Sequence, residues 1–92
     1  MISKEQIFNL ISQLNNEIKE INMLLFIEYY NTESMYIPYI QIYLFDKELG
    51  KQFGIFIDKS ILASLSINKL EFDLRKEILN RYDERERTEI SI

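Results

Sequence analysis

Cysteine, histidine and tryptophan are absent from this sequence of 92 residues. Without cysteine, neither a disulfide nor a thiolate metal site can form. Without histidine, the chain lacks the commonest general base, a common zinc ligand and the triads that depend on it. Glycine occurs twice and proline once, so no glycine-rich phosphate loop is present. We therefore expect a protein that is not an enzyme and has no cofactor or metal site.

Long hydrophobic runs are also missing. No window reaches the roughly 18 uninterrupted apolar residues of a membrane span. The N-terminal stretch carries Lys4 and Glu5 early and lacks the apolar core of a signal peptide. These features predict a cytoplasmic location and no membrane partner.

Positive charge is in short supply. The 11 basic residues are outnumbered by 15 acidic ones, which gives a net charge of −4, and neither half of the chain is basic. A surface that tracks phosphates is therefore disfavoured. The residue usage, rich in Ile, Lys and Asn and without Val, indicates an AT-rich genome and favours a phage or another mobile element as the source.

The first 21 residues after Met1 contain the clearest helical pattern. Ser3 and Gln6 have the spacing of a capping box, and Asn22 fits a left-handed stop. A helix is predicted over residues 2–21. Its apolar positions fall on one narrow stripe: Ile7, Leu10, Ile11, Leu14, Ile18 and Ile21.

Three strand-like runs follow, over residues 23–30, 36–45 and 53–57. Their short connections predict antiparallel neighbours, and Gly50 suits a turn that needs a positive φ. Pro38 cannot donate a ladder hydrogen bond, so it marks an edge or the beginning of the second strand.

The final helix is predicted over residues 67–87, with Ser66 as its N-cap and acid-first pairs such as Glu71–Arg75 along it. Residues 83–92 are expected to form a charged, frayed tail. The whole chain, 1–92, then forms one α+β domain of order α-β-β-β-α. We expect an antiparallel three-stranded sheet packed by two helices on one face.

Alternation along the strands assigns two sets of side chains to opposite faces. The aliphatic set is predicted to face the helices: Leu25, Ile27, Ile40, Ile42, Leu44, Phe53, Ile55 and Ile57. The other face receives Glu28, Gln41 and six aromatic residues: Phe26, Tyr30, Tyr39, Tyr43, Phe45 and Phe56. Contiguous exposed aromatics usually mark a contact surface, although a helix crossing to this side would make them ordinary core.

The last helix has a second apolar stripe, formed by Phe72 and Leu79 about a third of a turn from its core stripe. Glu71 and Arg75 lie between the two stripes. They either extend along the rim of the core or fix the register of an interface.

These observations favour a small acidic protein-interaction domain that acts by binding a protein target or itself, as a homodimer. Inhibitors, immunity proteins and phage- or plasmid-encoded antagonists of host defence enzymes have this profile. The candidate interface comprises the six aromatics of the outer face together with Glu71, Phe72, Arg75 and Leu79. The alternatives are a structural assembly subunit and a nucleic-acid-binding module, because the element order is that of double-stranded-RNA-binding domains.

Overall fold

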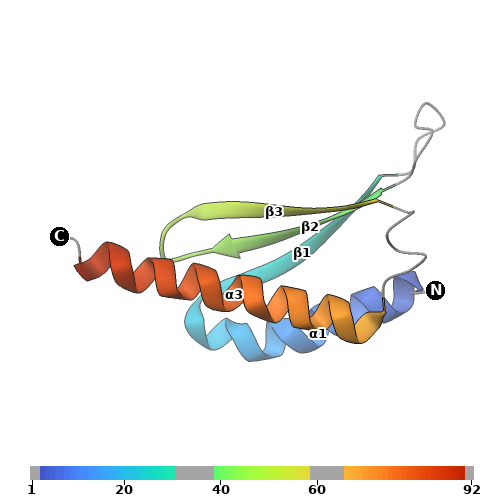
Figure 1. Ribbon diagram of the computed structural model, residues 1–92, viewed down its shortest axis with the longest axis horizontal. Coiled ribbons are helices and arrows are strands. Elements are labelled where there is room, and N and C mark those ends of the chain that lie inside the picture. Colours follow the sequence, from blue (N-terminus) through green and yellow to red (C-terminus); the bar gives the residue numbers. More distant parts are fainter. Residues whose placement is uncertain (1–2, 31–38, 59–65, 91–92) are drawn as a thin grey trace.

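The computed structural model describes residues 3–30, 39–58 and 66–90. The elements are helix α1 (Lys4–Ile18), the 3₁₀ helix η1 (Lys19–Ile21), strands β1 (Met23–Tyr30), β2 (Tyr39–Asp46) and β3 (Lys51–Asp58), and helix α3 (Ile67–Ile90). The α+β class and the order α-β-β-β-α are as predicted. Both helices lie under the same face of the sheet (Figure 1).

The first helix begins where its local signals place it. The Ser3 hydroxyl accepts a hydrogen bond from the Gln6 N–H at 3.1 Å, and the Gln6 side chain accepts one from the Ser3 N–H at 2.8 Å. This capping box satisfies two otherwise unpaired donors and confirms the predicted start. The helix ends at Ile18, earlier than predicted, and a 3₁₀ turn carries the chain to Asn22, which is left-handed at φ 57°.

The sheet has the strand order β1-β2-β3, with both pairs antiparallel. The four-residue turn between β2 and β3 includes Gly50, whose φ of 65° requires the freedom of glycine. Strand β3 begins at Lys51, two residues before its predicted start, because the register pairs Lys51 with Asp46. Pro38, residues 59–65 and Ile2 lie outside the described residues.

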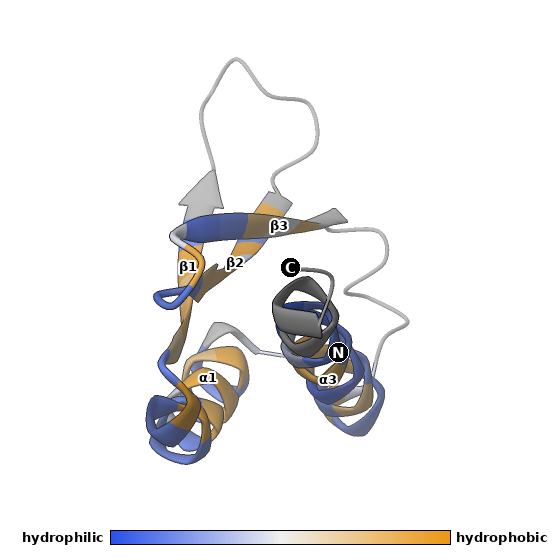
Figure 2. Cartoon of the chain, turned by 90° about the vertical axis from the view of Figure 1, so that its left-hand side faces the viewer, coloured by the Kyte–Doolittle hydropathy of each residue, from blue (hydrophilic) through white to orange (hydrophobic). Residues whose placement is uncertain are grey.

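The core lies between the sheet and the two helices, as an end-on view shows (Figure 2). The predicted inward phase of the strands is confirmed for Leu25, Ile40, Ile42 and Leu44, which are buried. The helices contribute Ile7, Leu10, Ile11, Leu14 and Ile18 from α1 and Leu70, Leu74 and Ile78 from α3. Ile27 and Ile55 are partly buried against this cluster.

A buried ion pair joins the hairpin to the far half of α3. Arg85 donates from Nη2 to Asp46 Oδ1 at 2.6 Å and from Nε to Oδ2 at 3.3 Å. Asp46 Oδ1 also accepts the N–H groups of Glu48 and Leu49, at 2.9 and 3.2 Å, which closes the turn. Asp46 is fully buried. The sequence gives no sign of this pair, because its members are 39 residues apart.

Helix α3 extends beyond its predicted end at residue 87, into the stretch expected to be a charged, frayed tail. Helix α3 continues to Ile90, and Arg85 is buried rather than solvated. One turn earlier, the Arg81 guanidinium lies 3.9 Å from the centroid of the Phe53 ring and pairs with Glu77. Arg81 and Arg85 therefore attach α3 to the sheet, where the mixed-sign composition around Arg85 alone predicts solvent exposure.

Replacing Leu14 by Ala should lower the free energy of unfolding by about 2–5 kcal/mol, since a fully buried leucine leaves both lost transfer energy and a cavity. The matched control is Gln13→Ala, which truncates an exposed neighbour on the same helix. Urea titration of both variants measures the difference. Equal midpoints would show that the helix does not pack as described.

Replacing Asp46 by Ala should cost about 3–5 kcal/mol, because Arg85 is then left buried without its counter-charge and the turn loses its acceptor. Asp83→Ala removes a carboxylate at an exposed position of α3 and should change stability by less than about 0.5 kcal/mol. Chemical denaturation of both variants measures the two changes in the free energy of unfolding. Similar small losses for both would mean that the buried pair does not hold α3.

Candidate protein interface

One face of the sheet is not covered by any described element. Both helices lie on the opposite side (Figure 2). The register aligns two rows across this face: Leu24 with Phe45 and Gln52, and Phe26 with Tyr43 and Gly54. Leu24 is exposed, and Phe26, Tyr43 and Phe45 are half-buried. We call Leu24, Phe26, Tyr43 and Phe45, with the polar residues beside them, the open face.

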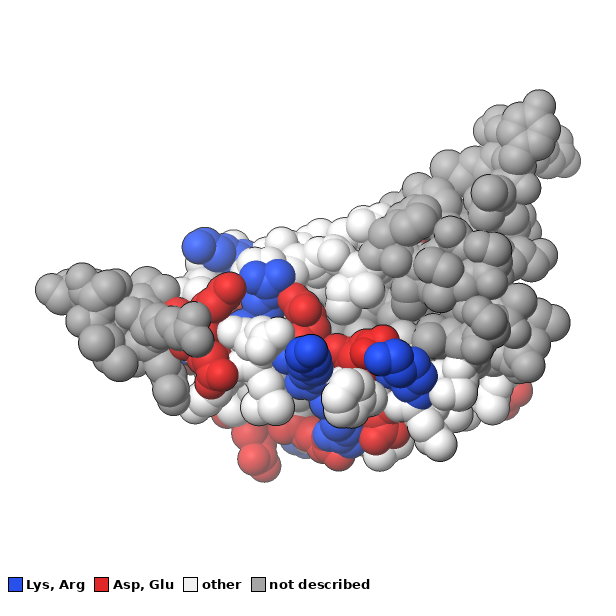
Figure 3. Space-filling model, viewed as in Figure 1, with Lys and Arg blue, Asp and Glu red and all other residues white. Residues whose placement is uncertain are grey.

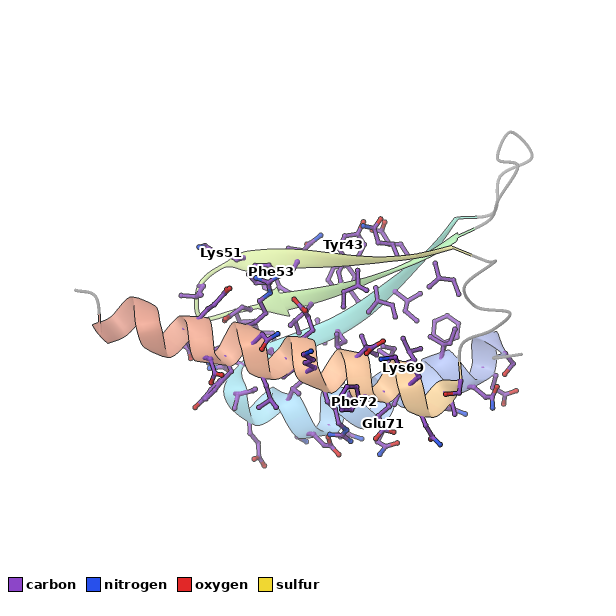
Figure 4. The ribbon with its side chains drawn as sticks, viewed as in Figure 1. Tyr43, Lys51, Phe53, Lys69, Glu71 and Phe72 are labelled. Carbon is purple, nitrogen blue, oxygen red and sulfur yellow. The ribbon has the colours of Figure 1, made fainter. Side chains whose placement is uncertain are left out.

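The centre of the open face is a pair of stacked rings. The centroids of Phe26 and Tyr43 are 5.0 Å apart, and the ring planes meet at 17°. Tyr43 lies on the side of the sheet away from α3 (Figure 4). Its strand neighbour Gly54 has no side chain, and a Cβ there would lie 2.8 Å from Gln41 Nε2 and 3.5 Å from the Tyr43 ring. The rings thus form a shallow, ordered surface rather than a deep pocket.

The polar groups of the open face carry negative charge only. Glu28 is exposed, and its carboxylate lies 3.4 Å from the Tyr43 hydroxyl, which donates to it. Gln41 and Gln52 are neutral. Among the described side chains of this face there is no lysine or arginine. Aromatic platforms that stack nucleic-acid bases normally have basic groups beside them, so this face fits a protein better than a phosphate backbone.

Three further predicted interface residues lie in the strands at the expected register positions. Tyr30 pairs with Tyr39 at one end of the sheet, and Phe56 lies opposite Gln41. Their side chains are outside the described part of the structure, so their place in the interface stays a prediction.

Helix α3 presents the second predicted stripe to solvent. Phe72 and Leu79 are 61% and 62% exposed, the two highest values among the large exposed hydrophobic residues. Phe72 projects from the side of α3 away from the sheet (Figure 4). On the face shown in Figure 3, basic and acidic side chains are interspersed over the region of α3 without forming a patch of one sign. The predicted separation of the two stripes is confirmed, whereas the contact role of the outer stripe is not tested by its exposure.

The predicted pair Glu71–Arg75 forms part of a link between the helices. Arg75 Nε contacts Glu71 at 3.1 Å, and its Nη1 reaches Glu17 of α1 at 2.6 Å. The hydrogen bond from Arg75, reinforced by the guanidinium charge, holds the pKa of Glu17 below its usual 4.5. The pair therefore lies at the rim of the core and connects α1 with α3.

In the described part of the structure, an apolar hollow and a polar hollow border α3. An apolar hollow of about 210 Å³ lies between the helices, lined by Leu14, Ile18, Arg75, Ile78 and Leu79. A polar one of about 230 Å³ follows the surface of α3, lined by Glu77, Asn80, Arg81, Asp83 and Glu84. No group of three or more carboxylates in the described part of the chain is arranged to hold a metal ion.

No protein-family model, no curated protein and no solved structure matches this chain. In the described residues, no helix combines the length and the apolar character needed to cross a bilayer.

The Glu17–Arg75 link predicts a pH effect of definite sign. The pKa of Glu17 is lowered on folding. Its contribution to the stability of the fold is therefore present above the pKa of the unfolded chain and is lost as the pH falls through the pKa of the folded state. Glu17→Gln should therefore flatten the acid side of the plot of stability against pH. Glu20→Gln, at an exposed position of η1, is the control. Parallel acid limbs for wild type and Glu17→Gln would contradict the prediction.

Proposed function

We propose that this chain is a non-catalytic domain that acts by binding another protein through the open face of its sheet. The observation that carries the proposal is the set of Leu24, Phe26, Tyr43 and Phe45 on the face opposite both helices, a face that no described helix or strand covers. A solvated sheet face normally alternates to polar residues. Burying a large apolar side chain is worth roughly 1.5–3 kcal/mol, so a partner gains binding energy at each of these positions.

The shape of the open face supports a protein as the ligand. A flat, aromatic surface without a deep cavity suits a second macromolecule, whereas small-molecule sites are concave. Aromatic residues are also the side chains most enriched among those that dominate binding energy. We place the protein among small inhibitors, immunity proteins and antagonists, on the support of its size, its net charge of −4 and its AT-rich residue usage.

The alternative of nucleic-acid binding has less support. The stretch that corresponds to the Lys-rich start of the last helix in double-stranded-RNA-binding domains holds a single lysine, Lys69, which pairs with Asp73 at 3.0 Å. Submicromolar binding to RNA or DNA near 0.15 M salt, with a steep salt dependence, would favour this alternative over the proposed function.

The proposal is tested by placing a charge on the open face. Tyr43→Glu and Leu24→Glu should each abolish capture of the protein that wild type retains from cells of the source organism, because a carboxylate beside Glu28 or Phe45 must then be desolvated. The matched control, Lys76→Glu, puts the same side chain at an exposed position of α3 and should retain the partner. Affinity capture followed by mass spectrometry compares the three variants.

Sedimentation of the same variants distinguishes binding of a different protein from self-association of this chain. A wild-type dimer that becomes monomeric in both open-face variants identifies the bound protein as a second copy. Retention of the same partner by Tyr43→Glu and Leu24→Glu would show that the open face is not the binding surface. If Tyr43→Glu unfolds, Leu24→Glu, at a position that is 39% exposed, still decides.

A further inference from the structure

The two edges of the sheet differ in how the described side chains protect their backbone groups. Strand order makes β1 and β3 the edge strands. At β1, the side chain of Asn15 on α1 imitates a neighbouring strand. Its Nδ2 donates to the Leu25 carbonyl at 2.9 Å, and its Oδ1 accepts the Leu25 N–H at 2.7 Å. An edge protected in this way cannot pair with another chain at its centre.

The same two bonds reveal which backbone groups β3 presents at its outer edge. Leu25 turns its N–H and C=O away from β2, so its partner Leu44 must turn its own groups toward β3. Leu44 faces Phe53, and the groups of Phe53 therefore point inward. Because the direction alternates along a strand, the N–H and C=O groups of Gln52 and Gly54 point outward.

Among the described residues, no side chain caps the edge of β3 as Asn15 caps that of β1. In the described ranges, no hydrogen bond reaches this edge from outside the sheet. Lys51, Gln52 and Gly54 are exposed. The described part of the strand contains neither a proline nor a bulge, which are common devices for blocking an edge.

We infer that the outer edge of β3 binds an extended segment of a partner protein, which joins the sheet as an antiparallel strand. This rests on the proposed function, because it names how a protein partner engages the chain. Main-chain groups of Gln52 and Gly54 provide the pairing, as in other cases of strand addition. The added strand would also extend the open face, since Gly54 belongs to both surfaces.

Two residues of β3, Lys51 and Gly54, specify the chemistry of that segment. Lys51 has no ion pair among the described residues, because its strand neighbour Asp46 is occupied by Arg85 and the turn amides. An acidic residue opposite Lys51 therefore fits. Gly54 leaves a site without a side chain beside Tyr43, and a large aromatic residue in the adjacent strand compensates such a glycine. In antiparallel pairing, the acid follows the aromatic residue by three positions.

A second copy of β3 does not meet both requirements. The register that faces Gly54 with Phe56 of a second copy places Lys51 opposite another lysine, Lys59. The register centred on Gly54 pairs glycine with glycine and provides no acid for Lys51. These registers exclude β3 of a second copy as the occupant. The occupant that we infer is a segment of another protein, with the pattern aromatic-x-x-acid in extended conformation.

The test uses the peptide acetyl-Thr-Thr-Val-Phe-Thr-Val-Glu-Thr-Thr-amide and a scrambled peptide of the same composition. Hydrogen exchange followed by NMR should show at least about tenfold slower exchange of the Gln52 and Gly54 amides with the first peptide, as expected for amides that gain a hydrogen bond. The scrambled peptide should leave them unchanged. Unchanged exchange at both amides with the first peptide at millimolar concentration would overturn the inference.

Variants then assign the binding to the backbone. Gln52→Pro removes an outward N–H and leaves the hydrogen bonds to β2 in place, so it should lower the affinity for the peptide roughly tenfold. Gln52→Ala retains that donor and should bind the peptide with unchanged affinity. Lys51→Glu should also lower the affinity. If Gln52→Pro fails to fold, N-methylation of the Phe and of the second Val of the peptide removes the facing donors instead. Equal binding by the methylated peptide would contradict strand addition.

The outcomes for the two surfaces can be told apart. Loss of partner capture in Tyr43→Glu without peptide-induced protection of Gln52 and Gly54 supports the proposed function and overturns the edge inference. Protection of these amides together with unaffected capture in Tyr43→Glu supports the edge and contradicts the open face.

Discussion

The pair of Asp46 and Arg85 determines how the layers of this protein are joined. Two charges buried at 2.6 Å are stable only when every oxygen and N–H finds a partner, and Asp46 meets this condition with contacts to Arg85, Glu48 and Leu49. The hairpin turn and the far half of α3 are consequently fixed together. With α3 held under β2 and β3, and α1 under β1, both helices are committed to one face of the sheet.

The open face results from the packing of both helices on one side of the sheet. A chain of 92 residues with two long helices has no further described element to cover the second face, and the strand phase that buries Ile42 and Leu44 turns Tyr43 and Phe45 outward. Asn15 adds a second asymmetry, because it protects the edge of β1, whereas no side chain in the described ranges caps the edge of β3 in the same way. The open face and the edge of β3 meet at Gly54, so one partner can use both.

The sequence by itself determined the elements and the faces, because these depend on local rules. The capping box of Ser3 and Gln6, the left-handed Asn22 and the N-cap hydrogen bond of Ser66 to the Lys69 N–H involve residues close together in the chain. Alternation along the strands has a period of two, which assigned Phe26, Tyr43 and Phe45 to the outer face without any knowledge of packing.

Only the tertiary structure decided which polar residues are buried and which edge is open. Asp46 reads as a turn residue and Arg85 as part of a solvated charged run, since their partnership spans 39 residues. Asn15 lies among the polar residues of α1, and nothing local indicates that its amide pairs with Leu25. Such contacts depend on how the helices pack against the sheet. Which backbone groups of Gln52 and Gly54 point outward follows only once a contact such as that of Asn15 with Leu25 fixes the hydrogen-bonding phase of the sheet.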